Sequence, residues 1–381
     1  MASTHTVQDG GLDWDALLGR SVAPMDMAFL AAPFAGKRVF ITGAGGWIGS
    51  ALARALAAMQ PGSLVLLDCA EQGLYEIDAD LRELRGGAPY TAVLGDVCDA
   101  TLLAEIFSRH RPEIVYHAAA CKHVPLMEQN PIAAVRTNAI GTYMLAQAAL
   151  QSGVERLVLL STDKAVAPRS IMGASKRAAE LVLLALQTAA TRMQAVRLGN
   201  VLGSRGSVVP LFQKQIAQGG PITVTAPEVR RYFLTLREAL ALLLLVAQPE
   251  HGSGTFIPDL GEQVRILDLA RFLMEAAPGP AGREVPIVFT GLRPGDKMEE
   301  ALLSAGGSFA GPTVGHATRP LRAVQGPHLT RWELAAAMEE LQQSICGRNL
   351  PSILRTLLRL VPEYQPSQLL CDNGMAPVTT R

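Results

Sequence analysis

Residues 38–49 read RVFITGAGGWIG, an apolar run followed at once by four glycines and the start of a helical pattern. This order predicts a β-strand, a tight turn and a helix whose N-terminus faces the turn. The glycines let the backbone approach a pyrophosphate, and the helix N-terminus favours its negative charge. An ordinary strand-to-helix turn can have the same glycines, so the motif needs support from its surroundings.

An acidic residue at the end of the next apolar run gives that support. Asp68 follows Gly49 by 19 residues, a position from which a carboxylate can bind the ribose hydroxyls of NAD. No arginine follows Asp68 directly to bind a 2′-phosphate, so NAD is favoured over NADP. The predicted cofactor-binding residues at these two strand ends are Gly43, Gly46, Trp47, Ile48, Gly49 and Asp68.

The alternation of strand and helix continues along the chain. Apolar runs separated by alanine- and leucine-rich helical patterns cover residues 38–42, 64–68, 90–95, 113–117, 156–161 and 194–199. Such strands indicate a parallel sheet covered by helices on both faces. We therefore predict an α/β fold with a Rossmann-type doubly wound parallel sheet. After the third and fourth runs come further candidates for cofactor binding, namely Asp96, Val97, Ala118, Ala119 and Asn138.

Frequent glycine and proline residues loosen this pattern after about residue 203. They predict a smaller C-terminal lobe that binds the substrate. The expected organisation is an N-terminal tail and lead-in segment, an NAD-binding domain, a substrate-binding lobe interleaved with the sheet domain, and a C-terminal tail, over residues 1–36, 37–203, 204–366 and 367–381.

The composition excludes several classes of protein. Lys+Arg and Asp+Glu number 34 each, so no net charge attracts nucleic acid or an anionic membrane. The cysteines and histidines form no C-x-x-C or H-E-x-x-H pattern, which predicts reduced thiols and no metal. No signal peptide begins the sequence, and the most apolar run, residues 239–247, is too short to span a membrane. We expect a cytoplasmic protein.

The stretch Ser161–Lys176, STDKAVAPRSIMGASK, indicates which reactions the protein could catalyse. In nicotinamide-dependent short-chain dehydrogenases/reductases, Tyr-x-x-x-Lys places a phenol one helical turn from an ammonium, which lowers the pKa of the phenol and makes it a base. Here Met172 takes the tyrosine position, while Lys176 is retained. Because a thioether cannot accept that proton, the protein catalyses an altered reaction or none.

Between residues 17 and 366, the chain resembles the polysaccharide-biosynthesis branch of the extended short-chain dehydrogenases/reductases, the UDP-N-acetylglucosamine 4,6-dehydratase family. Within it, the chain is similar to the subclass with methionine at the tyrosine position. Members of that subclass commonly form the cytoplasmic half of a longer membrane protein. This chain resembles their soluble catalytic module alone. The strings that carry it are TGAGGWIGS, LVLLDCAEQGLYEI, HAAACKHVPLMEQNP, TNAIGT, STDKAVAPRSIMGASKRAAE, RLGNVLGSRGSVVPLFQKQIAQGGPITVT, RRYFLT and GLRPGDK.

The resemblance implies a reaction in which carbon 4 of a UDP-sugar is oxidised by tightly bound NAD, water leaves across carbons 5 and 6, and the hydride returns to carbon 6, so that NAD is recycled. Lys164 would be the base at carbon 5 and Asp163 the acid at the departing hydroxyl. For this role, Lys164 needs a pKa lowered by burial or by a neighbouring cation such as Lys176. Ser161 occupies the position of the serine that assists hydride transfer. Lys176, which also binds the cofactor ribose in the family, or Lys164 would replace the tyrosine at carbon 4.

Further positions match family residues that face a nucleotide sugar, and arginines among them suit bidentate binding of a diphosphate. Two departures beside the expected sugar pocket, Ala226 for a histidine and Arg230 for a threonine, leave the identity of the sugar open. A third, Trp47 for a small residue, lies in the glycine turn. The predicted substrate-binding residues are Lys122, His123, Asn200, Arg205, Arg231 and Arg293.

Three functions remain open from the sequence. The first is the 4,6-dehydratase. The second is a 5,6-dehydratase of a nucleotide sugar or nucleoside, as in some antibiotic pathways, with the hydride returned to carbon 4. The third is a non-catalytic dinucleotide-binding protein. A simple epimerase is disfavoured, because epimerisation needs no Asp-Lys pair. By resemblance, helices at residues 132–151 and 174–190 would pair between copies in a homo-oligomer.

Overall fold

The computed structural model describes residues 12–21, 27–84, 86–276, 285–304, 308–314, 321–324 and 329–374. Parts of the two predicted tails, residues 1–11 and 375–381, lie outside these ranges.

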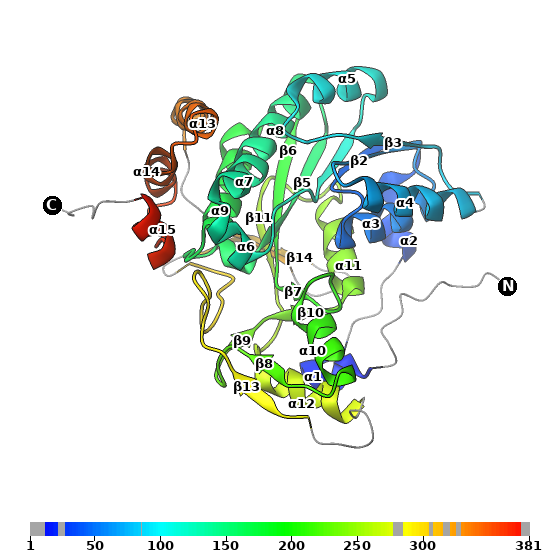
Figure 1. The fold of residues 1–381 in the computed structure, drawn as a ribbon. Coiled ribbons are helices and arrows are strands. Elements are labelled where there is room, and N and C mark those ends of the chain that lie inside the picture. Colours follow the sequence, from blue (N-terminus) through cyan, green and yellow to red (C-terminus); the bar gives the residue numbers. More distant parts are fainter. Residues whose placement is uncertain are drawn as a thin grey trace.

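Within these ranges, nine strands form the central sheet, in the order β14-β15-β11-β6-β5-β4-β1-β2-β3 (Figure 1). Neighbouring strands from β3 to β11 run parallel, whereas β15 is antiparallel to both β11 and β14. The predicted Rossmann-type doubly wound sheet is confirmed, and the six predicted runs correspond to β1–β6. The strands are β1 (Arg38–Thr42), β2 (Ser63–Asp68), β3 (Tyr90–Leu94), β4 (Ile114–His117), β5 (Arg156–Thr162), β6 (Arg192–Leu198), β11 (Gly254–Pro258), β14 (Phe309–Val314) and β15 (Leu321–Val324).

Helices cover both faces of this sheet, because alternate strand residues point to opposite sides. In β1, Phe40 belongs to one buried core, whereas Val39 and Ile41 belong to the other. The helices of the Phe40 side are α5 (Ala100–His110), α8 (Thr142–Gln151) and α9 (Ile171–Leu186). Those of the opposite side are α3 (Trp47–Ala58), α4 (Glu71–Glu83) and α11 (Leu236–Val246).

The most apolar run of the sequence lies mainly in α11. All of its residues except Arg237 are buried, as the sequence predicts for a core helix. Within the described ranges, no helix is both long and apolar enough to cross a membrane.

A smaller lobe has its own core below the sheet (Figure 1). It contains the parallel pair β8 (Ile222–Val224) and β13 (Ile287–Phe289), with α10 (Val208–Ala217) and α12 (Ile266–Ala276). The short helix α1 (Trp14–Leu18) packs into the same core through Trp14 and Leu18. Part of the lead-in segment is therefore a structural element of the lobe.

The chain then returns from the lobe to the sheet. The helices α13 (Arg331–Cys346) and α14 (Leu350–Leu360) pack beside α9 in the core of the sheet domain. The predicted C-terminal tail, residues 367–381, is in part a packed element. It begins with α15 (Gln368–Gly374), where Leu370 is buried in that core, and Ser367 donates a hydrogen bond to Glu128.

The helix α9 is covered by its own chain. All of its residues except Ala185 are buried, and its neighbours include α8, α13 and α14. The expectation that this helix pairs with a second copy is therefore wrong, because its surface is already packed within one chain. A homo-oligomer itself stays a prediction.

The docking of α15 gives a test of the C-terminal core. Leu370 is 1% exposed, so Leu370→Ala should lower the free energy of unfolding by about 2–5 kcal/mol through lost burial and a residual cavity. Leu94→Ala, at a leucine that is 58% exposed on β3, is the matched control and should change it by less than about 0.5 kcal/mol. Urea denaturation measures both, and equal effects would contradict the docking of α15.

Candidate active site

A cavity of about 900 Å³ lies at the carboxyl ends of β1, β4, β5 and β6 and extends into the lobe. Open parallel sheets bind their ligands at this edge. Most of the predicted site residues line it: Gly43, Gly46, Trp47, Ile48, Gly49, Ala118, Lys122, His123, Ser161, Lys164, Met172, Lys176, Asn200, Arg231 and Arg293. The others are not part of this lining: Asp68, Asp96, Val97, Ala119, Asn138, Asp163 and Arg205.

The glycine turn packs closely against the backbone at the end of β4. Gly43 has a φ of +70°, and a Cβ there would lie 2.4 Å from the backbone nitrogen of Ala119. A Cβ on Gly49 would lie 2.0 Å from the carbonyl oxygen of Gly43. Only glycine allows this approach. Gly46 precedes α3 as its N-cap, and no described side chain caps the helix there, so its first amide groups are available to an anion.

Two acidic residues hold neighbouring strand ends in place. Asp68 accepts hydrogen bonds from the amides of Gly45 and Ala70, both at 2.8 Å, and so ties β2 to the glycine turn. Asp96 accepts one from the Cys98 amide at 2.9 Å and pairs with Arg136 at 2.8 Å. Burial opposes ionisation of Asp96, but these two partners outweigh it and lower its pKa.

Asn138 supports the cavity from behind. It lies in the π-helix η2 (Arg136–Gly141). Its amide accepts a hydrogen bond from the Cys121 nitrogen at 2.8 Å and donates to the Cys121 carbonyl at 3.0 Å and to the Ser175 hydroxyl at 2.9 Å. Asn138 therefore joins the segment after β4 to α9. Direct contact with a cofactor stays a prediction for this residue.

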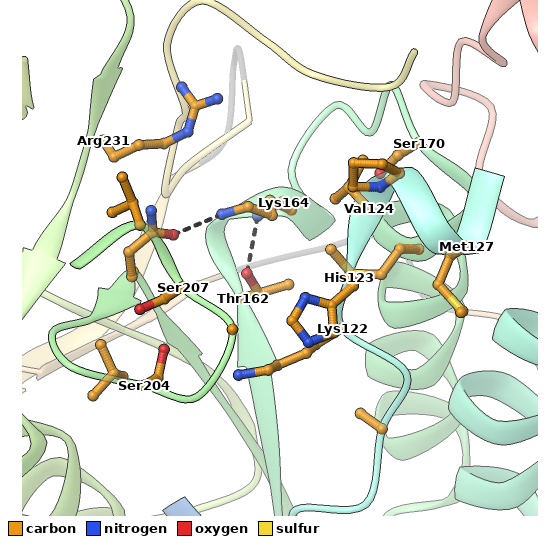
Figure 2. A pocket seen from close by; sticks show the side chains of 18 of the residues that line it. Lys122, His123, Val124, Met127, Thr162, Lys164, Ser170, Ser204, Ser207 and Arg231 are labelled. Carbon is orange, nitrogen blue, oxygen red and sulfur yellow. Dashed lines mark hydrogen bonds between the residues drawn. The ribbon is translucent and has the colours of Figure 1, made fainter. Parts of the chain in front are cut away.

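The Asp163-Lys164 pair forms a single 3-10 turn, η3 (Asp163–Ala165), at the end of β5. Lys164 Nζ donates to Asp163 Oδ1 and to Asn200 Oδ1, both at 2.9 Å. Thr162 also donates to Asp163 Oδ1, at 2.9 Å. Asp163 is fully buried, whereas Lys164 and Thr162 line the cavity. Figure 2 shows Lys164 and Thr162 between Lys122 and His123 on one side and Arg231 on the other.

The predicted lowering of the Lys164 pKa is wrong for this structure. Burial lowers the pKa of Lys164, but the charges of Asp163 and Glu300 outweigh burial and raise it above the ordinary lysine value. The second carboxylate lies 3.8 Å from Lys164. Lys164 is therefore held as an ammonium.

The helix α9 places Met172 and Lys176 on the cavity wall, one turn apart. Burial lowers the pKa of Lys176 to about 8, although Glu180 opposes this shift. Of these two lysines, Lys176 and not Lys164 has the lowered pKa.

A buried cluster of charges lies behind Ser161. The Ser161 hydroxyl donates to Glu180 at 2.6 Å, and Glu180 also accepts from Arg197 at 2.7 and 2.9 Å and from Arg177 at 2.8 Å. Burial alone would raise the pKa of Glu180, but the two arginines and Ser161 lower it to about 2. The sequence analysis missed this cluster, although an arginine within the apolar run at residues 194–199 was a usable signal.

The predicted substrate residues fall into two groups. Lys122 donates to the Arg205 carbonyl at 3.0 Å, and the Arg205 side chain pairs at 2.6 Å with Glu76 on α4, away from the cavity. Arg231 and Arg293 line the cavity, as Lys122 does, whereas Arg205 does not. A diphosphate role stays a prediction for all of them, and the geometry favours Arg231 and Arg293 over Arg205.

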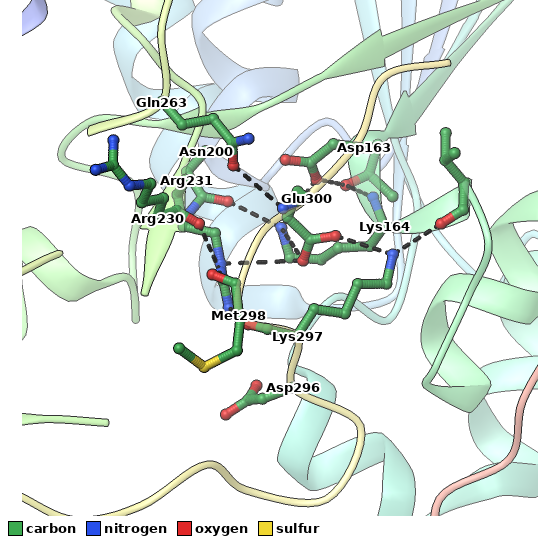
Figure 3. A network of polar contacts seen from close by, with 12 residues as sticks. Asp163, Lys164, Asn200, Arg230, Arg231, Gln263, Asp296, Lys297, Met298 and Glu300 are labelled. Carbon is green, nitrogen blue, oxygen red and sulfur yellow. Dashed lines mark hydrogen bonds and ion pairs between the residues drawn. The ribbon is translucent and has the colours of Figure 1, made fainter. Parts of the chain in front are cut away.

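Two residues from the lobe complete the polar wall and were missed by the sequence analysis. Glu300 is buried and pairs with Lys297 at 3.0 Å, and both line the cavity (Figure 3). The signal was the acidic end of GLRPGDKMEE, just after a matched family string. Among the described residues, no group of three or more His, Cys, Asp or Glu could hold a metal ion.

Comparison with curated proteins gives related sequences. The chain is 46% identical over 290 residues to "Probable polysaccharide biosynthesis protein EpsC" of Bacillus subtilis, covering 76% of this chain and 48% of that protein. It is 32% identical to a "UDP-N-acetylglucosamine 4,6-dehydratase (inverting)" of Campylobacter jejuni, over 71% of this chain and 79% of that one. A "UDP-glucose 4-epimerase" of Rickettsia prowazekii is 34% identical, over 71% and 79%. The chain spans about half the length of the first of these relatives.

Solved structures share the fold. "Pen from Bacillus thuringiensis" has a TM-score of 0.66 and 25% identity, covering 82% of this chain and 98% of that one. "WbmG in complex with NAD and UDP" from Bordetella bronchiseptica has a TM-score of 0.57 and 26% identity, covering 68% and 83%. The sequence profile described as "Polysaccharide biosynthesis protein" matches residues 39–318. The predicted membership is confirmed: the chain belongs to the polysaccharide biosynthesis protein family of extended short-chain dehydrogenases/reductases.

Proposed function

We propose that this protein is an NAD-dependent nucleotide-sugar dehydratase of the UDP-N-acetylglucosamine 4,6-dehydratase type. The observation that carries the proposal is the Asp163-Lys164 pair, which lies at one cavity with Lys176 and the glycine turn. An elimination needs an acid and a base beside a site of oxidation. The family relative from Campylobacter, whose name states this reaction, supports the same assignment.

The residues at the glycine turn fit NAD. The missing Cβ atoms of Gly43 and Gly49 let the backbone approach a pyrophosphate, and the N-terminus of α3 favours its charge. Asp68, which contacts the glycine turn from the end of β2, is the residue that would bind the ribose hydroxyls. When bound, NAD supplies the hydride acceptor at carbon 4 and the hydride returned at the end, so it is recycled. The WbmG structure, with NAD and UDP, is consistent with this choice.

Lys176 and Ser161 take the place of the missing tyrosine. A pKa of about 8 leaves part of Lys176 neutral near pH 7, so its amine can accept the proton of the carbon-4 hydroxyl, directly or through water. Ser161 directs its hydrogen to Glu180, which leaves its lone pairs free to accept a hydrogen bond from that hydroxyl. Met172 contributes an apolar wall and no proton acceptor.

The Asp163-Lys164 pair holds one proton that can move across 2.9 Å. When this proton passes to Asp163, the neutral Lys164 amine can remove the proton at carbon 5. Asp163 is buried behind the cavity, so its proton reaches the departing carbon-6 hydroxyl through Thr162 or Lys164, which both contact Asp163 and line the cavity. The elimination takes one proton from carbon 5 and gives one to the departing hydroxyl. Carbon 5 takes a proton back from Lys164 as the hydride returns to carbon 6, and the proton that Lys176 removed from the carbon-4 hydroxyl restores the proton count of the site.

Product analysis tests the function directly. Purified protein with NAD and UDP-N-acetylglucosamine in deuterated water should release one water per sugar and give a 4-keto-6-deoxy product with deuterium at carbon 5. Mass spectrometry and NMR identify it. An exocyclic alkene would instead establish the 5,6-dehydratase. NAD binding without turnover across a panel of nucleotide sugars and nucleosides would indicate a non-catalytic protein.

The catalytic lysine can be tested by substitution. Lys164→Ala should lower kcat by about 10²–10⁴-fold, because the base at carbon 5 is lost, while NAD binding is retained. Lys214→Ala, at an exposed lysine on α10, is the control and should leave kcat within about twofold. Full activity in Lys164→Ala would remove this residue from the mechanism.

The low pKa of Lys176 predicts a pH dependence. The neutral amine is the active form, so kcat for the first oxidation should rise with pH and reach half its maximum near pH 8. Single-turnover measurements of NADH formation follow this step. Lys176→Arg keeps the positive charge but cannot deprotonate in this range, so the rise should vanish and the rate should fall. The same pH profile in both proteins would contradict the assignment.

A further inference from the structure

Glu300 is a buried carboxylate surrounded by cations. Its side chain is 3% exposed, and its two oxygens lie 3.0 Å from Lys297 Nζ, 3.8 Å from Lys164 Nζ and 3.9 Å from Arg231 Nε. These three cations belong to different parts of the chain and all line the cavity. The reaction steps described above give Glu300 no role, so its position at this junction needs another explanation.

The segment that carries Glu300 is fixed from two sides. The Glu300 amide donates to Gln263 Oε1 at 3.1 Å, and Arg231 donates to the Lys297 carbonyl at 2.9 Å, both within the lobe. On the other side, Lys297 Nζ donates to the Val166 carbonyl at 2.7 Å, directly after the catalytic turn. Figure 3 shows the carboxylate of Glu300 between these groups. The lobe therefore brings a negative charge to the catalytic lysine.

We propose that Glu300 is a positioning residue whose carboxylate is the shared countercharge of Lys164, Arg231 and Lys297, and holds them together at the cavity until an anionic substrate binds. The proposal rests on the proposed function, since it takes the diphosphate of a nucleotide sugar as that anion. Three cations that converge in a mostly buried place repel one another, and they stay converged only with a carboxylate among them.

This role predicts opposite effects on binding and on catalysis. Glu300 competes with the diphosphate for Arg231 and Lys297, so removal of its charge should strengthen the binding of anions. The same change removes one of the two carboxylates beside Lys164, so the lysine is held less firmly against its partners. A merely structural role for Glu300 would weaken binding and catalysis together.

The test uses the full chain loaded with NAD and the variant Glu300→Gln. Isothermal titration with UDP should give a Kd about 3- to 10-fold lower than for the unchanged protein, as expected for the loss of one negative charge near the ligand. In the same variant, kcat with UDP-N-acetylglucosamine should fall about 10-fold or more. Glu299→Gln is the matched control: Glu299 is 63% exposed and pairs only with Arg230, at 3.9 Å, among the described ion pairs, so both values should stay within about twofold.

Several results would overturn the proposal. One is a folded Glu300→Gln that binds UDP with the same or lower affinity, and another is tighter binding with an unchanged kcat. If Glu300→Gln does not fold, Glu300→Asp replaces it. Aspartate keeps the negative charge but is one methylene shorter, so the charge lies farther from Lys164. The Kd for UDP should then stay near the original value while kcat falls. Loss of both UDP binding and activity in Glu300→Asp would also overturn the proposal.

Failure of the proposed function is distinguishable from failure of this inference. If the protein dehydrates no UDP-sugar, titration of both proteins with inorganic pyrophosphate still decides the countercharge role. Tighter pyrophosphate binding in Glu300→Gln supports it without any assumption about the nucleotide. Absence of binding to both UDP and pyrophosphate in the unchanged protein overturns it, since the three cations would then form no anion site.

Discussion

The buried charge on Glu180 is the constraint on which the arrangement of the site depends. One carboxylate joins Ser161 at the end of β5, Arg197 at the end of β6 and Arg177 on α9. Arg177 also pairs with Glu363, at 3.2 Å, in the segment after α14. Removal of one partner from such a buried network costs about 3–5 kcal/mol, because the others are left uncompensated. The network therefore fixes α9 to the strand ends, and with it Met172 and Lys176 opposite the Asp163-Lys164 turn.

The same network explains why Lys176 and Lys164 differ. Glu180 is one helical turn from Lys176, but its charge is already shared by two arginines and a hydroxyl. Lys176 thus gains little from it, and burial lowers its pKa. Lys164 lies between Asp163 and Glu300, whose charges raise its pKa despite burial. Two lysines whose environments push their pKa values apart can divide the work of acid and base.

The sequence predicted the sheet and the glycine turn because these depend on local patterns. Each predicted strand is a short apolar run, and the glycine turn follows from the steric requirement at Gly43 and Gly49. The contacts of Glu180 and Glu300 could not be predicted in this way. Both depend on which distant segments the fold brings together. Glu180 lies 17 positions from its partner Arg197, and Glu300 lies 136 positions from Lys164. The sequence predicts a lowered pKa for Lys164 from burial or a neighbouring cation, because the second carboxylate, Glu300, is far from Lys164 along the chain.

The loss of the tyrosine can be understood from this placement of charges. A phenol at residue 172 would act as the base only with a cation beside it to lower its pKa. Here that cation can itself be the base, because Lys176 is buried and Glu180, whose charge favours the protonated amine, is neutralised by arginines. In the proposed mechanism, Lys164 keeps its proton during the first oxidation, since Asp163 and Glu300 hold it as an ammonium, and passes it to Asp163 for the elimination. The proposed site therefore has one base for the carbon-4 hydroxyl, Lys176, and a separate Asp163-Lys164 pair for the elimination, while Met172 forms an apolar part of the cavity wall.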